Sequence, residues 1–176
     1  MDRGEEFAEV EVTQALLRRQ LDQLLPLPGL DQEDQAISFS GDQERLIFTA
    51  PAPSQFGLGG VYYFDLFAER AEQGRRLVLR WQLYRPDRDE LFNDEESQQR
   101  TLLENIETVE FSYYGDPELF EIGERIDTGE WRERWVEAAL PPQLIAVRIA
   151  FPENDTRYWP ELIIAPRSTT GDSEPQ

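Results

Sequence analysis

The chain opens with an apolar pattern of helical period. Between Phe7 and Leu25 there is neither glycine nor proline, and apolar side chains recur at spacings of three, four and seven residues. This spacing predicts one amphipathic helix, roughly 25 Å or more in length at about 1.5 Å per residue. Because proline lacks an amide donor, the run Pro26 to Gly29 should end it. The predicted seam, with a glutamine at one polar position, comprises Phe7, Val10, Gln14, Leu17, Leu21 and Leu24.

After residue 29 the apolar period changes to two, which is typical of strands that bury one face. In the run Arg76 to Tyr84, for example, the odd-numbered positions from Leu77 to Leu83 are apolar, while Arg80 and Gln82 are polar. One-sided alternation favours antiparallel pairing. Seven strands are predicted: Ala36–Phe39, Arg45–Ala50, Val61–Phe67, Arg76–Tyr84, Ile106–Tyr114, Leu144–Phe151 and Tyr158–Ile164.

These elements predict an α+β fold in which one N-terminal helix packs on antiparallel β-sheets, two rather than one for seven strands. Three segments follow: a helix over residues 1–25, a β-rich domain over 26–166 and a flexible tail over 167–176. The acidic stretch from Asp87 to Arg100 is predicted as a long loop. No apolar run approaches the roughly 18 to 20 residues that span a bilayer, and the start lacks the features of a secretory signal.

Charge and composition exclude several function classes. The 36 acidic and 17 basic residues give a formal net charge of -19, which repels nucleic acid and anionic lipid surfaces. The sequence contains no cysteine and no histidine, which excludes thiolate metal sites, disulfides and imidazole-based triads. All of the basic residues are arginine, so no lysine nucleophile exists either. We therefore predict no catalytic residue, no metal site, no cofactor and no small-molecule substrate.

Two clusters of acidic or aromatic residues offer alternatives to this prediction. Asp87–Glu90 and Asn93–Glu96 offer oxygen ligands for calcium, but their spacing does not match an EF-hand, and a solvated loop is favoured. Trp131 and Trp135 lie among glutamates, as in a sugar site or a glycosidase, but packing of both tryptophans against a sheet edge is favoured. Gly57–Gly60 lacks dinucleotide-binding spacing and is predicted as a turn.

A more specific indication comes from residues 102–114, LLENIETVEFSYY. This stretch resembles the LLENVxxxxFxYxD motif of the minor pseudopilin J of type II secretion systems. The features that follow it in that family occur here in the same order. They are the Glu-Trp step at Glu130–Trp131, a second tryptophan at Trp135, the Leu-Pro pair at Leu140–Pro141 and a strand at Ala146–Ile149. Upstream, Leu77–Arg85 and Leu16–Leu21 resemble a family strand and the helix that leaves the membrane.

The resemblance implies a pilin-like fold and a structural role at the tip of the pseudopilus, whose assembly exports folded proteins. It implies partners among the I-type and K-type minor pseudopilins, with the H-type as a further candidate, and the seam residues would pack beside their helices. It also implies a single-pass anchor in the bacterial inner membrane, with this domain in the periplasm; the family's hydrophobic start is missing here. The alternative is a freestanding extracytoplasmic domain that binds carbohydrate or protein, or less favourably a glycoside hydrolase.

Overall fold

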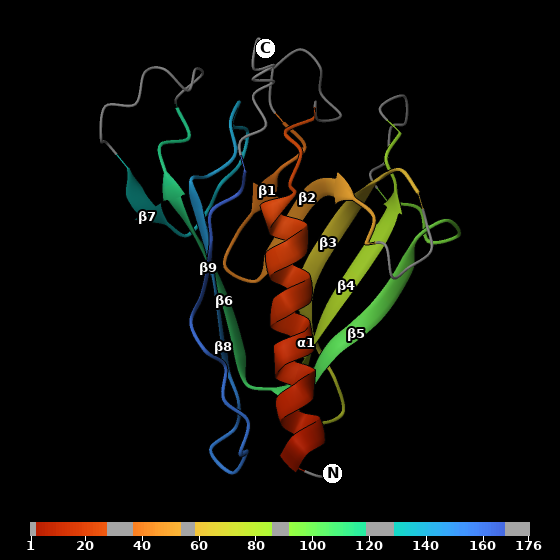
Figure 1. Ribbon diagram of the computed structural model, residues 1–176, viewed down its shortest axis with the longest axis vertical. Helices are drawn as coiled ribbons and strands as arrows, with labels where there is room; N and C mark the ends of the chain where they lie inside the picture. The colour runs from red at the N-terminus through yellow and green to blue at the C-terminus, as the bar shows by residue number, and fades with distance from the viewer. Residues whose placement is uncertain (1–2, 28–36, 54–58, 86–91, 119–128, 168–176) are drawn as a thin grey trace, which may run out of the picture.

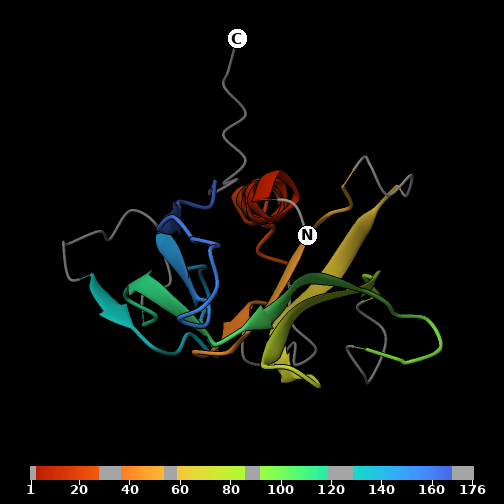
Figure 2. The same cartoon turned by 90° about the horizontal axis from the view of Figure 1, so that it is seen from below.

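The computed structural model describes residues 3–27, 37–53, 59–85, 92–118 and 129–167, and it confirms the predicted fold class. One helix packs against two antiparallel sheets of five and four strands, arranged as a V that opens toward the helix (Figures 1 and 2). The elements are α1 (Arg3–Asp22), β1 (Ser40–Gly41), β2 (Arg45–Pro51), β3 (Val61–Arg70), β4 (Arg75–Leu83), β5 (Gln98–Ile106), β6 (Thr108–Gly115), β7 (Glu130–Arg132), β8 (Leu144–Ala150) and β9 (Leu162–Ile164).

The helix begins at Arg3, within the predicted segment 1–25 and four residues before the apolar pattern starts at Phe7, and it ends three residues sooner than predicted, at Asp22. Its end has a physical cause besides the following proline. The amide of Leu25 donates a hydrogen bond of 2.7 Å to the carbonyl of Thr49 in β2, so this amide is no longer available to the helix. The chain therefore passes directly from α1 to the end of the first sheet.

The first sheet has the order β1-β2-β3-β4-β5, and the predictions for β2, β3 and β4 are confirmed. The first predicted strand is wrong: the strand lies at Ser40–Gly41, and of Ala36–Phe39 only the last three residues are described. Strand β5 was missed, because the part of it before Thr101 was assigned to the acidic loop. Gln98, Gln99 and Arg100 are exposed on this edge strand and carry no apolar alternation.

The second sheet has the order β7-β6-β8-β9. Its centre pairs β6 with β8, and Phe111 faces Val147 across the two strands. The predicted strand Ile106–Tyr114 is confirmed as β6 except for its first two residues, since β5 ends at Ile106 and the chain turns at Glu107 before β6 begins at Thr108. The last prediction was too long, because only Leu162–Ile164 is a strand, and β7 was not predicted.

A short backbone junction joins the two sheets. Gly41 of β1 and Trp135 form an isolated antiparallel bridge in which each amide donates to the other's carbonyl at 2.9 Å. The buried hydroxyl of Tyr113 donates to the carbonyl of Asp42 at 2.7 Å and reinforces this junction. One hydrophobic core consequently runs from α1 through both sheets, rather than one core for each sheet.

No helix among the described residues combines the length and the apolar character that crossing a membrane requires. The predicted tail lies outside the described residues except for Arg167. This residue bonds α1 through its amide, which donates to the carbonyl of Asp22 at 3.1 Å, and through its guanidinium, 3.0 Å from the Asp22 carboxylate.

Candidate partner interface

Four of the six predicted interface residues face the interior of the chain. Val10, Leu17, Leu21 and Leu24 are at most 3% exposed and belong to the core between α1 and the two sheets. A partner could reach them only after α1 had left its own sheets, which would expose several leucines, each worth about 1.5 to 3 kcal/mol of burial. Contact of these residues with a partner is not tested by this structure and stays a prediction.

The other two predicted residues lie at the edge of the buried face. Phe7 is 66% exposed, which is unusual for a large aromatic side chain on a helix that buries its apolar stripe. Gln14 is partly buried, and its amide Nε2 donates a 2.8 Å hydrogen bond to the carbonyl of Pro160. This glutamine is thus tied to the segment before β9 within the same chain.

An exposed arc runs along the rest of α1. Val12 is 64% exposed, and two alanines, two arginines and a glutamate share the arc with it. Small side chains allow another backbone to approach closely, and long charged ones can pair across such a contact. The members of this exposed arc are Ala8, Glu11, Val12, Ala15, Arg18 and Arg19.

Residues 156–160 run alongside the N-terminal half of α1. Thr156 donates a hydrogen bond of 3.0 Å to the carboxylate of Glu6, and Pro160 accepts the bond from Gln14 two turns farther along. Trp159 is buried and donates through Nε1 to the carbonyl of Val147 at 2.9 Å. Both ends of the segment are therefore fixed to α1, and its middle is fixed to the second sheet.

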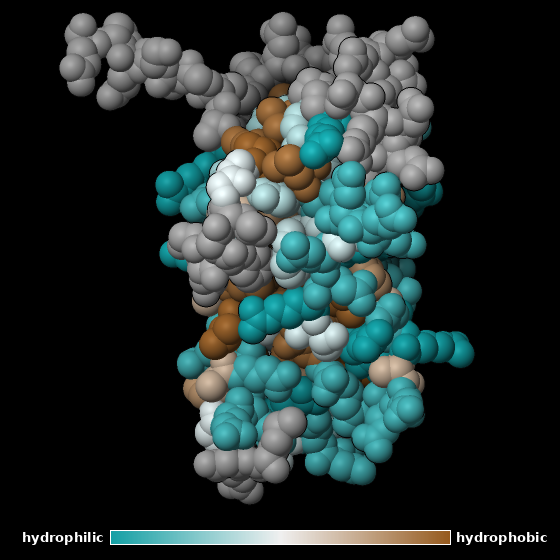
Figure 3. All heavy atoms as spheres, turned by 90° about the vertical axis from the view of Figure 1, so that its right-hand side faces the viewer, coloured by the Kyte–Doolittle hydropathy of each residue, from teal (hydrophilic) through white to brown (hydrophobic). Residues whose placement is uncertain are grey.

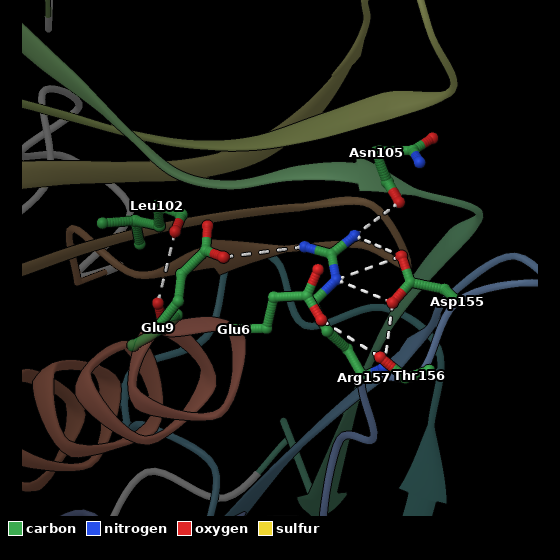
Figure 4. A network of polar contacts seen from close by, with 8 residues as sticks. Glu6, Glu9, Leu102, Asn105, Asp155, Thr156 and Arg157 are labelled. Carbon is green, nitrogen blue, oxygen red and sulfur yellow. Dashed lines mark hydrogen bonds and ion pairs between the residues drawn. The ribbon is translucent and has the colours of Figure 1, made fainter. Parts of the chain in front are cut away.

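A nearly buried arginine anchors this segment (Figure 4). The side chain of Arg157 is 7% exposed, and its guanidinium bonds both carboxylate oxygens of Asp155, at 2.8 to 3.1 Å. It also donates to the carbonyl of Asn105 at 3.0 Å and lies 3.8 Å from the Glu9 carboxylate. The same group lies 4.2 Å from the centre of the Phe151 ring. One cation thus connects α1, the end of β5 and the loop after β8.

The carboxylates around Arg157 respond to it differently. A hydrogen bond from Arg157 lowers the pKa of Asp155, which stays ionised. The pKa of Glu9 is raised, chiefly because partial burial disfavours its charge, and the nearby Glu104, Glu6 and Asp155 add to this while Arg157 opposes it. The cluster is therefore held together by a single positive charge among several acids.

A second buried charge belongs to the far face of the first sheet. Asp65 is fully buried and accepts hydrogen bonds of 2.6 to 2.8 Å from Arg45 and Arg80 on the neighbouring strands. Both of its oxygens are thereby satisfied, so this carboxylate has a structural environment rather than that of a reactive group.

The described residues do not form a calcium site, and only one of the two tryptophans of the sugar hypothesis is exposed. Asp87–Glu90 lies outside the described residues, and the described part of the chain contains no group of three acidic side chains placed to hold a metal. Trp135 is buried and donates to the carbonyl of Leu140 at 3.0 Å, as packing predicts. Trp131 is 48% exposed on β7 and contacts the Tyr114 ring edge-on. Gly60, at the predicted turn, has a φ of 99° and precedes β3.

The surface around β5 is mainly hydrophilic. In Figure 3, which faces this edge of the first sheet, hydrophilic residues cover most of the described surface and hydrophobic ones occur in small groups. Large exposed apolar side chains are instead found on α1, on β7 and in the segments around β9, at Phe7, Val12, Trp131, Tyr158 and Ile163 among others. Arg157 and Tyr158 were not among the site residues predicted from the sequence. The only feature of the sequence that marks them is the pair of aromatic residues before Pro160.

The comparisons with known proteins agree with this architecture. A family model described as type II secretion system (T2SS), protein J, matches residues 1–158. The chain belongs to this family. It is also similar to the type II secretion system protein J of Xanthomonas campestris pv. campestris, with 27% identity over 177 residues, which cover 96% of this chain and 79% of that protein.

Membership confirms the resemblance found at residues 102–151, and it places the chain among components of the type II secretion system. The protein J family is a family of structural secretion proteins, not one of enzymes. In structural terms the LLEN stretch, residues 102–105, lies in the last part of β5, just before the corner at Glu107 that leads into β6 of the second sheet.

Proposed function

We propose that this protein is a minor pseudopilin that helps to initiate the pseudopilus from its tip, without catalytic activity of its own. The observation that supports this most directly is the exposed apolar surface of α1. Val12 and Phe7 are each more than 60% exposed on a helix that otherwise buries its large apolar residues, and the exposed Ala8 and Ala15 lie between them on the same arc. Exposed apolar side chains on a rigid helix are typical of a surface that another protein covers.

The proposed partners are the I-type and K-type minor pseudopilins. A rigid helix, fixed to both sheets by the core and by Arg157, can bind without the entropic cost of ordering a flexible segment. In the cell the helix would continue from an inner-membrane anchor, so that this domain works in the periplasm. The proposed function is therefore assembly with partner proteins, not catalysis.

The test is a mixing experiment with the soluble I-type and K-type domains of the same organism, followed by size-exclusion chromatography with light scattering. We expect a stoichiometric complex. Val12→Asp should weaken it, because a charge on the exposed arc must then be buried. The matched control is Val136→Asp, which makes the same change at an exposed valine between β7 and β8 and should leave the complex intact.

Absence of a complex with either domain at high micromolar concentration would contradict this function. A glycan-binding screen would then be the next measurement, with Trp131→Ala as its control, because that exposed tryptophan is the feature on which the carbohydrate alternative depends.

A further inference from the structure

Two exposed aromatic side chains flank the same side of α1. Phe7 and Gln14 are seven residues apart, so they lie on one side of the helix, about two turns from each other. Gln14 is bonded to Pro160, and Glu6 is bonded to Thr156. Residues 156–160 therefore cover the distance between these two points, and Tyr158, at their middle, lies beside this stretch of the helix.

The outward direction of Tyr158 is fixed by its neighbours. Arg157 and Trp159 both point inward, where one bonds Asp155 and Asn105 and the other bonds Val147. Burial alternates along residues 155–160, and Tyr158, between these two inward side chains, points outward. It is 76% exposed, the largest value among the exposed large hydrophobic residues of the described chain, and Phe7 at 66% is the next.

Such an arrangement is typical of an interface anchor. Aromatic residues dominate the binding energy of protein interfaces, and they do so most effectively when they are held in place before binding. Here four side-chain hydrogen bonds hold the segment that carries Tyr158. Two of them join it to α1, and the other two are donated by Arg157 and Trp159 of the segment itself. The backbone that carries each ring is therefore fixed before a partner arrives.

The charge around the two rings defines the partner's chemistry. Glu11 is exposed one turn from Phe7 on the same side of α1, and Arg157 is already engaged by Asp155. With the net charge of -19, this surface repels anionic membranes and favours basic groups. An apolar side chain flanked by lysine or arginine is complementary to it.

We infer that Phe7 and Tyr158 form one docking surface, the Phe7–Tyr158 surface, for a helix of a partner minor pseudopilin that presents apolar side chains flanked by lysine or arginine. This inference rests on the proposed function and makes it more specific. The interface on this side includes residues 156–160, which lie more than 130 residues after the end of α1 in sequence and which Arg157 positions.

The experiment measures affinity for the soluble I-type and K-type domains by titration calorimetry, at low salt and at 0.5 M salt. Phe7→Ser and Tyr158→Ser should each weaken binding at least about tenfold, and Tyr158→Phe should restore most of it. Trp131→Ser removes another exposed aromatic side chain, from β7 on the far edge of the second sheet (Figure 1), and this variant should bind as the wild type does. Higher salt should weaken the wild-type complex.

Each outcome is decisive because both residues are exposed and their replacement leaves the core intact, which thermal unfolding verifies. Wild-type binding that survives the double variant Phe7→Ser and Tyr158→Ser within twofold overturns the docking surface and leaves the proposed function standing. If the wild type itself binds neither domain, the proposed function fails, and this inference fails with it.

Discussion

Gln20 is the residue whose environment is least explained by its chemistry. Its side chain is 1% exposed on the buried face of α1, and neither amide atom has a hydrogen-bond partner among the described residues. A buried polar group without a partner costs about 1 to 3 kcal/mol. Leucine has a similar volume and no polar atoms, so it suits the surrounding core better.

We therefore expect Gln20→Leu to raise the free energy of unfolding by about 1 to 2 kcal/mol in urea denaturation. Gln23→Leu is the matched control, since Gln23 is exposed just after the helix and should change little. A lower stability of Gln20→Leu would mean that the amide is satisfied, for example by a buried water.

At the scale of elements, the junction of the two sheets depends on a missing side chain. A Cβ at Gly41 would lie 2.1 Å from the hydroxyl oxygen of Tyr113, a fully buried residue that itself bonds the carbonyl of Asp42. The ring cannot move without disturbing the core beneath both sheets, so a methyl group here has no room.

Gly41→Ala should accordingly destabilise the protein by about 1 to 3 kcal/mol, measured as a shift of the thermal or urea midpoint at unchanged m-value. At Gly59 the same substitution meets no heavy atom within 4 Å, and its effect should stay within about 0.5 kcal/mol. Equal effects of the two substitutions would show that the junction tolerates displacement of Tyr113.

The elements that sequence predicted best are those with one buried and one exposed face. Strand β6 and helix α1 have this property, and their periods of two and 3.6 residues are visible in the sequence. Strand β5 lies at a sheet edge with a polar first half, so no such period marks where it begins. The sequence reveals the apolar seam of α1, but it does not reveal whether the seam faces the chain's own sheets or a partner. Both kinds of packing require the same pattern of apolar residues.

At the scale of the whole molecule, contacts between distant residues escaped prediction altogether. Arg157 joins α1, Asn105 and Asp155, and no local pattern indicates which carboxylate an arginine will meet.

The same distant contacts control how stability depends on pH. Charge repulsion at a net charge of -19 destabilises the folded chain at neutral pH, and protonation of repelling carboxylates relieves it.

Whether a carboxyl group stabilises the fold at low or at high pH follows from the direction in which folding shifts its pKa. The pKa of Glu9 is raised in the folded state, so its contribution to stability is present at low pH and is lost as pH rises through that pKa. Asp155 and Glu44 have lowered pKa values, each chiefly because of a hydrogen bond from an arginine. Their contributions are present above the ordinary carboxyl pKa and are lost as pH falls through the lowered values.

Stability should therefore increase as pH falls from about 7 toward 5, and decrease below about pH 4, where the arginine-bonded carboxylates protonate. Glu9→Gln isolates one part of this profile, because it is neutral at every pH. We expect the variant to unfold at a higher temperature than the wild type at pH 7 and at nearly the same temperature near pH 4. A variant that is less stable at pH 7 would instead mean that the attraction between Glu9 and Arg157 outweighs the cost of burying the Glu9 charge, and that Arg157 holds α1 through this carboxylate as well as through its neighbours.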